Sequence, residues 1–195
     1  MIYLRNPKSI DNTWHFVLND MFTDEELQII DSAVKNTPDE DGNIIKQDVD
    51  KTRDKIRKNT ATWLENKNEM EQVYHKLRDI FKYVNDAKFQ FAIDFLQPLE
   101  YLTYNKDSYF DWHVDGPMKE DNIHAIRKIS CSILLNEDYE GGDFNFNCKQ
   151  HGWNIGRIKK NSGLFFCSML PHTITPVIGG VRKSLVSWAC GPNFV

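Results

Sequence analysis

Three side chains that could bind a metal ion stand in the second half of the chain. His113 and Asp115 lie in the segment YFDWHVDG, and His172 comes later in LPHTITP. Residues i and i+2 of a β-strand point to the same side, so His113 and Asp115 could face one ion together. Two imidazoles and one carboxylate on one face of a six-coordinate ion leave the opposite positions open, which suits non-haem Fe(II). The triplet H-x-D is common by chance, so the prediction of an iron site depends on the residues C-terminal to His172.

A basic residue comes ten positions after His172. Gly179 and Gly180 imply a tight turn between His172 and this basic residue, Arg182. We therefore expect the strand after the turn to return antiparallel beside His172. Arg182 would then lie in the same cavity as the metal candidates, and Ser184 would face the same way and add a hydroxyl. Arginine can hold a carboxylate through two parallel hydrogen bonds. An arginine on a strand is usually solvated when nothing else surrounds it. Beside a metal triad, however, Arg182 is expected to bind the carboxylate of an organic acid.

The front of the chain contains two helical patterns and one strand. In FTDEELQIIDSAVKN, Thr23 is expected to cap a helix and Glu26 to complete a capping box. Between about residues 68 and 85, apolar side chains recur at intervals of three and four and form one stripe, which is typical of a helix packed on a core. The segment 56–64 is rich in threonine and apolar residues and is predicted to be a strand.

The rest of the chain is predicted to be rich in β-structure. Short apolar runs separated by turns cover 88–96, 99–105, 109–115, 128–136, 142–147, 163–168, 172–178 and 183–190. This spacing favours a sandwich or jelly roll over alternating β-α units. We therefore expect a mainly β fold with flanking helices, a double-stranded β-helix (jelly roll) with the N-terminal helices packed on one sheet. Residues 1–195 would form a single domain, with a helical part at about 1–87 and a jelly-roll core at about 88–195.

Composition narrows the choice of partners. The net charge is −4 and the isoelectric point is near 5.9, which argues against nucleic acid and gives no bulk attraction to anionic membranes. No apolar run reaches membrane-spanning length, and the first residues lack the apolar stretch of a secretory signal. The four cysteines are therefore expected to be reduced thiols in a cytoplasmic protein, in the host cytoplasm if the chain is viral. The oligomeric state is left open.

From about Ile56 to Pro192 the chain resembles the 2-oxoglutarate- and Fe(II)-dependent dioxygenases. It looks most like the prolyl 4-hydroxylase branch, which has small bacterial and viral members. The resemblance is carried by ordered motifs: IRKNTATWL, the H-x-D pair, LLNEDYEGGDFNF, GLFFCSMLPH before the distal histidine, and Arg182 with Trp188 six residues after it. Tyr104, nine residues before the first histidine of the triad, matches the family tyrosine that points at the co-substrate.

The resemblance implies a metal centre and its co-substrates. Fe(II) would be bound by His113, Asp115 and His172, with 2-oxoglutarate and O₂ as co-substrates and ascorbate as an accessory reductant. In this family the cofactor performs the oxidation, while the protein positions the reactants.

The resemblance also implies roles for four further residues. Arg182 would bind the distal carboxylate of 2-oxoglutarate, assisted by Tyr104 and Ser184, and Trp188 would form a wall near the iron. One position departs from the pattern of some relatives, because Leu134 stands where they carry a second co-substrate tyrosine.

The expected reaction is hydroxylation of a C–H bond, with a prolyl residue in a peptide or protein as the leading substrate. Phe110 stands where collagen-type enzymes place a tyrosine, so a substrate assignment that uses this position is open. The segment 116–128, with Lys119, His124, Arg127 and Lys128, is either a solvated loop or a surface for an acidic peptide. An oxygenase acting on a free amino acid, a small metabolite or an alkylated base is the first alternative. A non-catalytic binding module on the same fold is the second.

Overall fold

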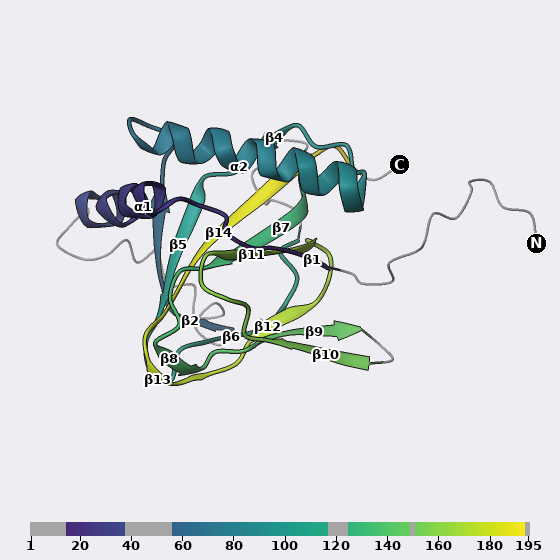
Figure 1. The fold of residues 1–195 in the computed structure, drawn as a ribbon. Helices are drawn as coiled ribbons and strands as arrows, with labels where there is room; N and C mark the ends of the chain where they lie inside the picture. The colour runs from purple at the N-terminus through teal and green to yellow at the C-terminus, as the bar shows by residue number, and fades with distance from the viewer. Residues whose placement is uncertain (1–14, 38–55, 117–124, 149–150, 194–195) are drawn as a thin grey trace, which may run out of the picture.

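The computed structural model describes residues 15–37, 56–116, 125–148 and 151–193. Two antiparallel sheets face each other, and the helices cover the outer side of the larger sheet (Figure 1). The expected fold class, mainly β in a jelly roll with helices packed on one sheet, is confirmed. No helix in the described ranges is long and apolar enough to cross a membrane.

The first helix begins where its capping residues predict. In α1 (Asp24–Asn36), the Thr23 hydroxyl accepts a hydrogen bond from the Glu26 backbone N–H at 3.2 Å, and the Glu26 carboxylate accepts one from the Thr23 backbone N–H at 2.7 Å. This is the predicted capping box, and it satisfies two backbone donors at the start of the helix. The second helix, α2 (Met70–Val84), buries one apolar stripe and continues as a π-helical turn, η1 (Asn85–Phe89).

The larger sheet carries the helices and forms one wall of the interior. Its strands, in spatial order, are β1 (His15–Leu18), β11 (Ser162–Cys167), β7 (Ile126–Leu134), β14 (Arg182–Gly191), β5 (Leu99–Tyr104) and β3 (Thr60–Leu64), with β4 (Phe95–Leu96) paired to β14. β1 and β3 come from the part of the chain that is predicted to be mainly helical, so the front of the chain contributes to this sheet at both ends.

The smaller sheet forms the opposite wall. Its order is β10 (His151–Gly156), β9 (Phe144–Cys148), β12 (His172–Ile174), β6 (Tyr109–His113) and β2 (Arg57–Lys58). A separate pair, β8 (Tyr139–Gly141) and β13 (Val177–Gly180), lies at one end. The apolar runs in the sequence do not predict β1, β8 or β10.

Strand alternation divides the core into two layers. Along β5, Tyr101 belongs to the cluster between the larger sheet and the helices, whereas Leu102 and Tyr104 belong to the cluster between the two sheets. Successive strand residues point to opposite faces, so Glu100 also faces the interior between the sheets. The interior cluster includes Phe144 and Phe166, which come from opposite sheets.

Two local predictions are wrong. Most of the segment 88–96 is a loop, because the Asn85 side chain accepts a hydrogen bond from the Phe91 N–H and donates one to the Phe91 carbonyl, both at 2.9 Å. The strand after Gly179 and Gly180 does not return beside His172. The turn instead separates β13 from β14, and β14 pairs with β5 and β7 in the sheet opposite β12.

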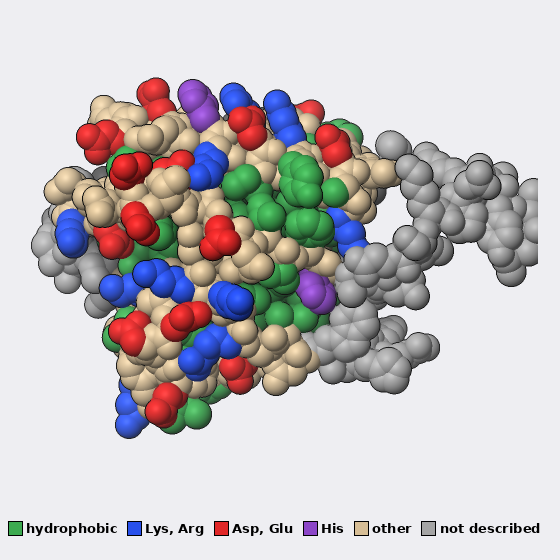
Figure 2. Space-filling view, viewed as in Figure 1, with side chains coloured by type: hydrophobic (Ala, Val, Ile, Leu, Met, Phe, Trp, Pro, Cys, Tyr) green, Lys and Arg blue, Asp and Glu red, His purple; other side chains and the backbone are tan. Residues whose placement is uncertain are grey.

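The surface carries no single-sign stripe on the face shown in Figure 2, where Lys and Arg side chains alternate with Asp and Glu over the described residues. This agrees with the modest net charge of −4. Residues 117–124, which include Lys119 and His124, lie outside the described residues.

Candidate metal and co-substrate site

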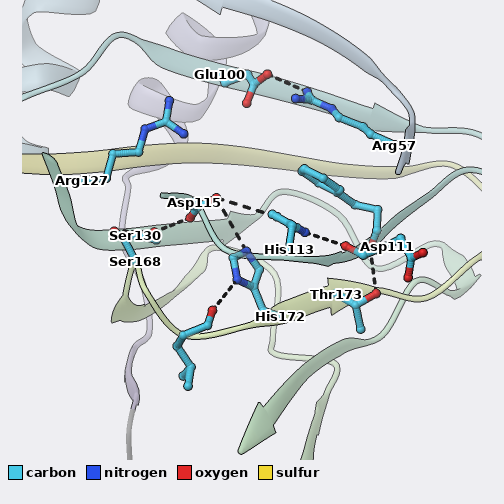
Figure 3. A network of polar contacts seen from close by, with 12 residues as sticks. Arg57, Glu100, Asp111, His113, Asp115, Arg127, Ser130, Ser168, His172 and Thr173 are labelled. Carbon is cyan, nitrogen blue, oxygen red and sulfur yellow. Dashed lines mark hydrogen bonds and ion pairs between the residues drawn. The ribbon is translucent and has the colours of Figure 1, made fainter. Parts of the chain in front are cut away.

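The three predicted metal ligands converge at the ends of two adjacent inner strands of the smaller sheet. His113 on β6 and His172 on β12 are directly paired across the antiparallel ladder, and Asp115 lies two residues beyond the end of β6. The Nε2 atoms of both histidines lie 3.8 Å from Asp115 Oδ1, and the candidate ligand atoms all lie within 4.8 Å of one another. This is the donor set of the two-histidine, one-carboxylate iron centres. Figure 3 shows the three side chains pointing toward one another.

Backbone carbonyls fix both imidazole rings. His113 Nδ1 lies 2.6 Å from the Asp111 carbonyl, and His172 Nδ1 lies 2.9 Å from the Leu170 carbonyl. A carbonyl only accepts, so each Nδ1 carries the proton and each Nε2 presents a lone pair. Burial, and to a lesser extent the neighbouring His172, lowers the pKa of His113 to about 4, which keeps this imidazole neutral near pH 7. The ring of Phe110 stacks on His113 with centroids 3.4 Å apart and restricts its rotation.

The carboxylate of the triad is fixed from the opposite sheet. Ser130, on β7, donates its hydroxyl hydrogen to Asp115 Oδ2, and the Ser168 hydroxyl lies 2.9 Å from the Ser130 hydroxyl. The Asp115 N–H donates to the Ser168 carbonyl at 3.0 Å. These contacts leave Asp115 Oδ1 facing the two imidazoles. Sequence reasoning does not identify Ser130 or Ser168, although the alternation in KISCSILL places Ser130 and Ser132 on one face.

Every predicted site residue lines one cavity of about 40 Å³. Its lining includes His113, Asp115 and His172 together with Tyr104, Arg182, Ser184 and Trp188. These side chains come from both sheets. The structure therefore brings Arg182 to the predicted cavity, although its strand neighbours differ from those expected.

Arg182 is a buried cation with an incomplete set of partners. Its exposed fraction is 4%, one terminal nitrogen donates to Ser184 Oγ at 3.0 Å, and Nε has no hydrogen-bond acceptor among the described residues. No carboxylate in the described ranges lies within ion-pair distance of it. Burying a guanidinium without a counter-ion is unfavourable, so this site fits an anionic ligand.

Tyr104 lines the cavity beside Arg182. It lies directly opposite Arg182 in the β5–β14 ladder, and the guanidinium carbon is 5.3 Å from the centre of its ring. Burial raises the pKa of Tyr104, so its hydroxyl remains a hydrogen-bond donor near neutral pH. Leu134, which stands where some relatives carry a second tyrosine, is buried opposite Ser184. An arginine, a serine and a tyrosine thus line the same cavity as the triad.

Other charged side chains in this region are not identified as site residues by the sequence. Glu100 is 4% exposed, lines the cavity, and accepts a hydrogen bond from an Arg57 terminal nitrogen at 2.6 Å. Arg127 is expected in a loop, but it lies on β7 with its guanidinium 3.7 Å from the centre of the Trp188 ring. The period-two alternation that places Leu102 and Tyr104 in the interior also places Glu100 there.

The fold and these contacts define a jelly-roll protein with an iron-type triad in the same cavity as a buried arginine. Residues 99–190, which contain the triad and Arg182, match the family model of the 2OG-Fe(II) oxygenase superfamily. This match supports a 2OG-Fe(II) oxygenase whose fold resembles that of prolyl hydroxylases. The family implies Fe(II), 2-oxoglutarate and O₂, and the donor set of the triad fits iron. No curated protein sequence matches the chain.

Solved structures show the same fold at low sequence identity. The viral collagen prolyl hydroxylase from Paramecium bursaria Chlorella virus 1, in complex with 2OG, is 18% identical with a TM-score of 0.64, and the match covers 94% of this chain and 99% of that chain. A prolyl-4-hydroxylase from Pseudomonas putida is 16% identical with a TM-score of 0.67, covering 91% and 92%. A Trichoplax adhaerens prolyl hydroxylase, in complex with a hypoxia inducible factor peptide fragment, is 15% identical with a TM-score of 0.69, covering 91% and 84%.

Proposed function

We propose that this protein hydroxylates a C–H bond of a prolyl residue in a peptide or protein, using Fe(II), 2-oxoglutarate and O₂. The observation that carries the proposal is the shared cavity, in which a metal-type triad faces a buried, unneutralised Arg182. An ion and a dicarboxylate can bind there side by side. A non-catalytic module on this fold would have no use for a buried cation or for open metal positions.

The chain holds the metal through three prepared atoms. Nε2 of His113, Nε2 of His172 and Oδ1 of Asp115 would bind Fe(II), because their other polar atoms are already engaged by carbonyls and by Ser130. Bound iron and 2-oxoglutarate would let O₂ react, with one oxygen atom entering succinate as the co-substrate loses CO₂ and the other entering the substrate C–H bond.

The chain orients the co-substrate from the other end. Arg182 would hold its distal carboxylate, with Ser184 and Tyr104 as further hydrogen-bond donors. Because Arg182 and Tyr104 are buried, water is excluded from this carboxylate, and the interaction is stronger than it would be in solvent. The co-substrate is thereby directed at the metal, and Trp188 borders the space that remains for the substrate.

The choice of a prolyl substrate is supported by relatives. Three structures with this fold are prolyl hydroxylases, and one of them is in complex with a peptide. Phe110 stacks on His113 and leaves an apolar surface at this side of the cavity, which suits an apolar ring of the substrate. Oxygenases of the same mechanism that act on free amino acids or metabolites are the competing assignment.

The test is aerobic incubation of the purified protein with Fe(II), 2-oxoglutarate and a set of proline-containing peptides beside free L-proline. We expect succinate to form and one peptide to gain the mass of a single oxygen atom. The matched control omits Fe(II). Succinate at the level of the iron-free control would contradict the oxygenase assignment, whereas succinate with modification of free proline alone would contradict the peptide assignment.

A further inference from the structure

The cavity contains one carboxylate that neither the metal site nor the co-substrate receptor uses. Glu100 and Asp115 are the acidic residues among those that line it in the described part of the chain. Asp115 belongs to the triad, whereas Glu100 lies on the opposite sheet, directly across the β5–β14 ladder from Val186. Its exposed fraction is 4%. A carboxylate this deeply buried is rare unless it is paired, so its partners indicate its role.

One oxygen of the Glu100 carboxylate is hydrogen-bonded, and the other is available. Oε1 accepts from the Arg57 guanidinium at 2.6 Å, which ties β2 to β5 across the two sheets. Arg57 is itself oriented by hydrogen bonding to Asn59 and by the ring of Phe110, which lies 5.2 Å from the guanidinium carbon. Among the described residues, no donor bonds to Oε2. In Figure 3 this second oxygen points away from Arg57, toward the side on which His113 and Asp115 lie.

An ion pair that served only to join two strands would bring little stability. Replacing a buried ion pair by apolar side chains of similar size is often neutral or stabilising, because desolvation offsets the attraction. Leu102 and Val186, the interior neighbours of Glu100, show that apolar residues are accepted on this wall. The carboxylate is therefore better explained by a ligand that needs it.

The surroundings of Glu100 define what that ligand carries. Its second oxygen is a carboxylate acceptor, and Arg57 binds the first oxygen from behind. On the same wall Trp188, 4% exposed, has an indole N–H without an acceptor among the described residues. Arg127, stacked on that indole, uses its Nε to donate to Gln97 at 2.6 Å. The wall thus offers one acceptor, the second oxygen of Glu100, beside the donors of Trp188 and Arg127. A carboxylate acceptor favours a positively charged nitrogen as its ligand.

We propose that Glu100 determines substrate specificity by binding a cationic nitrogen of the substrate next to the C–H bond that is hydroxylated. The inference rests on the oxygenase part of the proposed function, because it places the substrate in the cavity beside the metal, and it leaves the choice between a peptide and a free amino acid to the test. The nitrogen has two sources with the same chemistry. One is the secondary ammonium of a free amino acid such as L-proline, and the other is a lysine side chain beside the target residue of a peptide.

Equilibrium binding tests this without turnover. Isothermal titration would compare two ligand pairs on the protein loaded with Fe(II) and 2-oxoglutarate in the absence of O₂. The pairs are L-proline against N-acetyl-L-proline, and a lysine-containing prolyl peptide against the same peptide with acetylated lysine. We expect the cationic member of one pair to bind wild-type protein at least about tenfold more tightly, and Glu100→Gln to remove that preference. The pair that shows the effect identifies the source.

Two further variants separate recognition from a structural role. Glu71→Gln, on the exposed face of α2, changes the same charge away from the cavity and should keep the preference. Arg57→Gln releases Glu100 from its partner and should preserve or increase it. If Glu100 only joined the two strands, Glu100→Gln and Arg57→Gln would both lower the melting temperature. Neither substitution would then change the ratio of affinities between the charged and the acetylated ligand.

Two outcomes would overturn the assignment. One is equal or undetectable binding of the charged and acetylated members of both pairs to wild-type protein, and the other is a preference that persists in Glu100→Gln. Succinate formation by the same wild-type sample under air is measured in parallel. Its absence would contradict the proposed oxygenase function, whereas the affinity ratio tests Glu100 alone.

Discussion

His113 and His172 stand directly opposite each other on neighbouring antiparallel strands, and each ring is held by the carbonyl two residues before it. The same contact, from ring Nδ1 to a backbone carbonyl, thus occurs twice, once on β6 and once at the start of β12. It fixes the proton on Nδ1 of both rings and directs both Nε2 atoms at Asp115 Oδ1, 3.8 Å away. The metal site is in this way prepared by backbone geometry before any ion binds.

Substitution of the distal histidine is expected to remove the metal site while leaving the fold intact. His172→Ala should weaken Fe(II) binding by more than about 100-fold, because one of three ligands is lost, and loss of a residue that merely orients a ligand already reaches 10- to 100-fold. Anaerobic titration with Fe(II) measures this, and succinate formation should fall to background. His75→Ala, an exposed histidine on α2, is the matched control. Unchanged Fe(II) affinity in His172→Ala would refute the assignment of the triad.

The carboxylate of the triad should depend on Ser130. Ser130→Ala removes the hydroxyl that donates to Asp115 Oδ2 and leaves that oxygen free to rotate toward other partners. We expect Fe(II) affinity or turnover to fall about 10- to 100-fold, as is typical when a hydrogen-bond partner of a metal ligand is removed. Ser162→Ala is the control, because this equally buried serine donates to the Asn19 side chain away from the site. Equal effects of the two substitutions would show that only stability had changed.

The sequence predicts the metal triad better than the path of the chain around it. Alternation along a strand is local, so the spacing of His113 and Asp115 predicts their common orientation, although β6 ends at His113. The position of Arg182 depends on which strands pair, and a glycine turn does not specify this. The turn at Gly179 and Gly180 is expected to form a hairpin with the His172 strand, but the chain crosses to the opposite sheet. Arg182 reaches the same cavity because the two sheets face each other.

The charged residues near the substrate space cannot be identified in the same way. Glu100 lies in the run LEYLTY, where its neighbours indicate only a strand. Its partner Arg57 is 43 positions away, and no local pattern predicts that β2 joins the smaller sheet beside β6. Arg127 groups in the sequence with the basic segment before it, although β7 begins at Ile126. Long-range pairing therefore decides these contacts, as it decides that His172 meets His113, whereas local spacing accounts only for His113 and Asp115.

The hydroxyl of Tyr74 should couple stability to alkaline pH. It donates to the Leu64 carbonyl at 2.6 Å and accepts from the Leu99 N–H at 2.8 Å, which joins α2 to the last paired residues of β3 and β5. Burial raises the pKa of Tyr74 to about 12, against about 10 in the unfolded chain. Its contribution is fully present below pH 10 and is lost as pH rises toward 12, because the unfolded state releases a proton that the folded state keeps.

Denaturant unfolding between pH 8 and about 11.5 measures that coupling. Burial also raises the pKa of Tyr101 to about 12, so the wild-type slope contains at least two groups. Tyr74→Phe should reduce the slope by about one proton and lower the free energy of unfolding at neutral pH by about 1–3 kcal/mol, since a buried N–H and carbonyl lose their partner. The exposed Tyr83, on the same helix, provides the control Tyr83→Phe. An unchanged slope in Tyr74→Phe would contradict the assignment.

The position of Arg182 should depend on the absence of a side chain at Gly142. A Cβ at Gly142 would lie 2.9 Å from Arg182 Cδ, and the backbone there has a φ of +64°. Gly156 has nearly the same φ, +65°, but a Cβ there would meet its nearest atom at 3.7 Å. Alanine at either position introduces the same backbone strain of roughly 1–2 kcal/mol, yet only Gly142→Ala displaces the guanidinium. We therefore expect Gly142→Ala to weaken binding of 2-oxoglutarate to the Fe(II)-loaded protein by about tenfold or more, and Gly156→Ala to leave it unchanged. Anaerobic calorimetry on both variants decides the point, and equal affinities in the two would contradict the dependence of co-substrate binding on the space at Gly142.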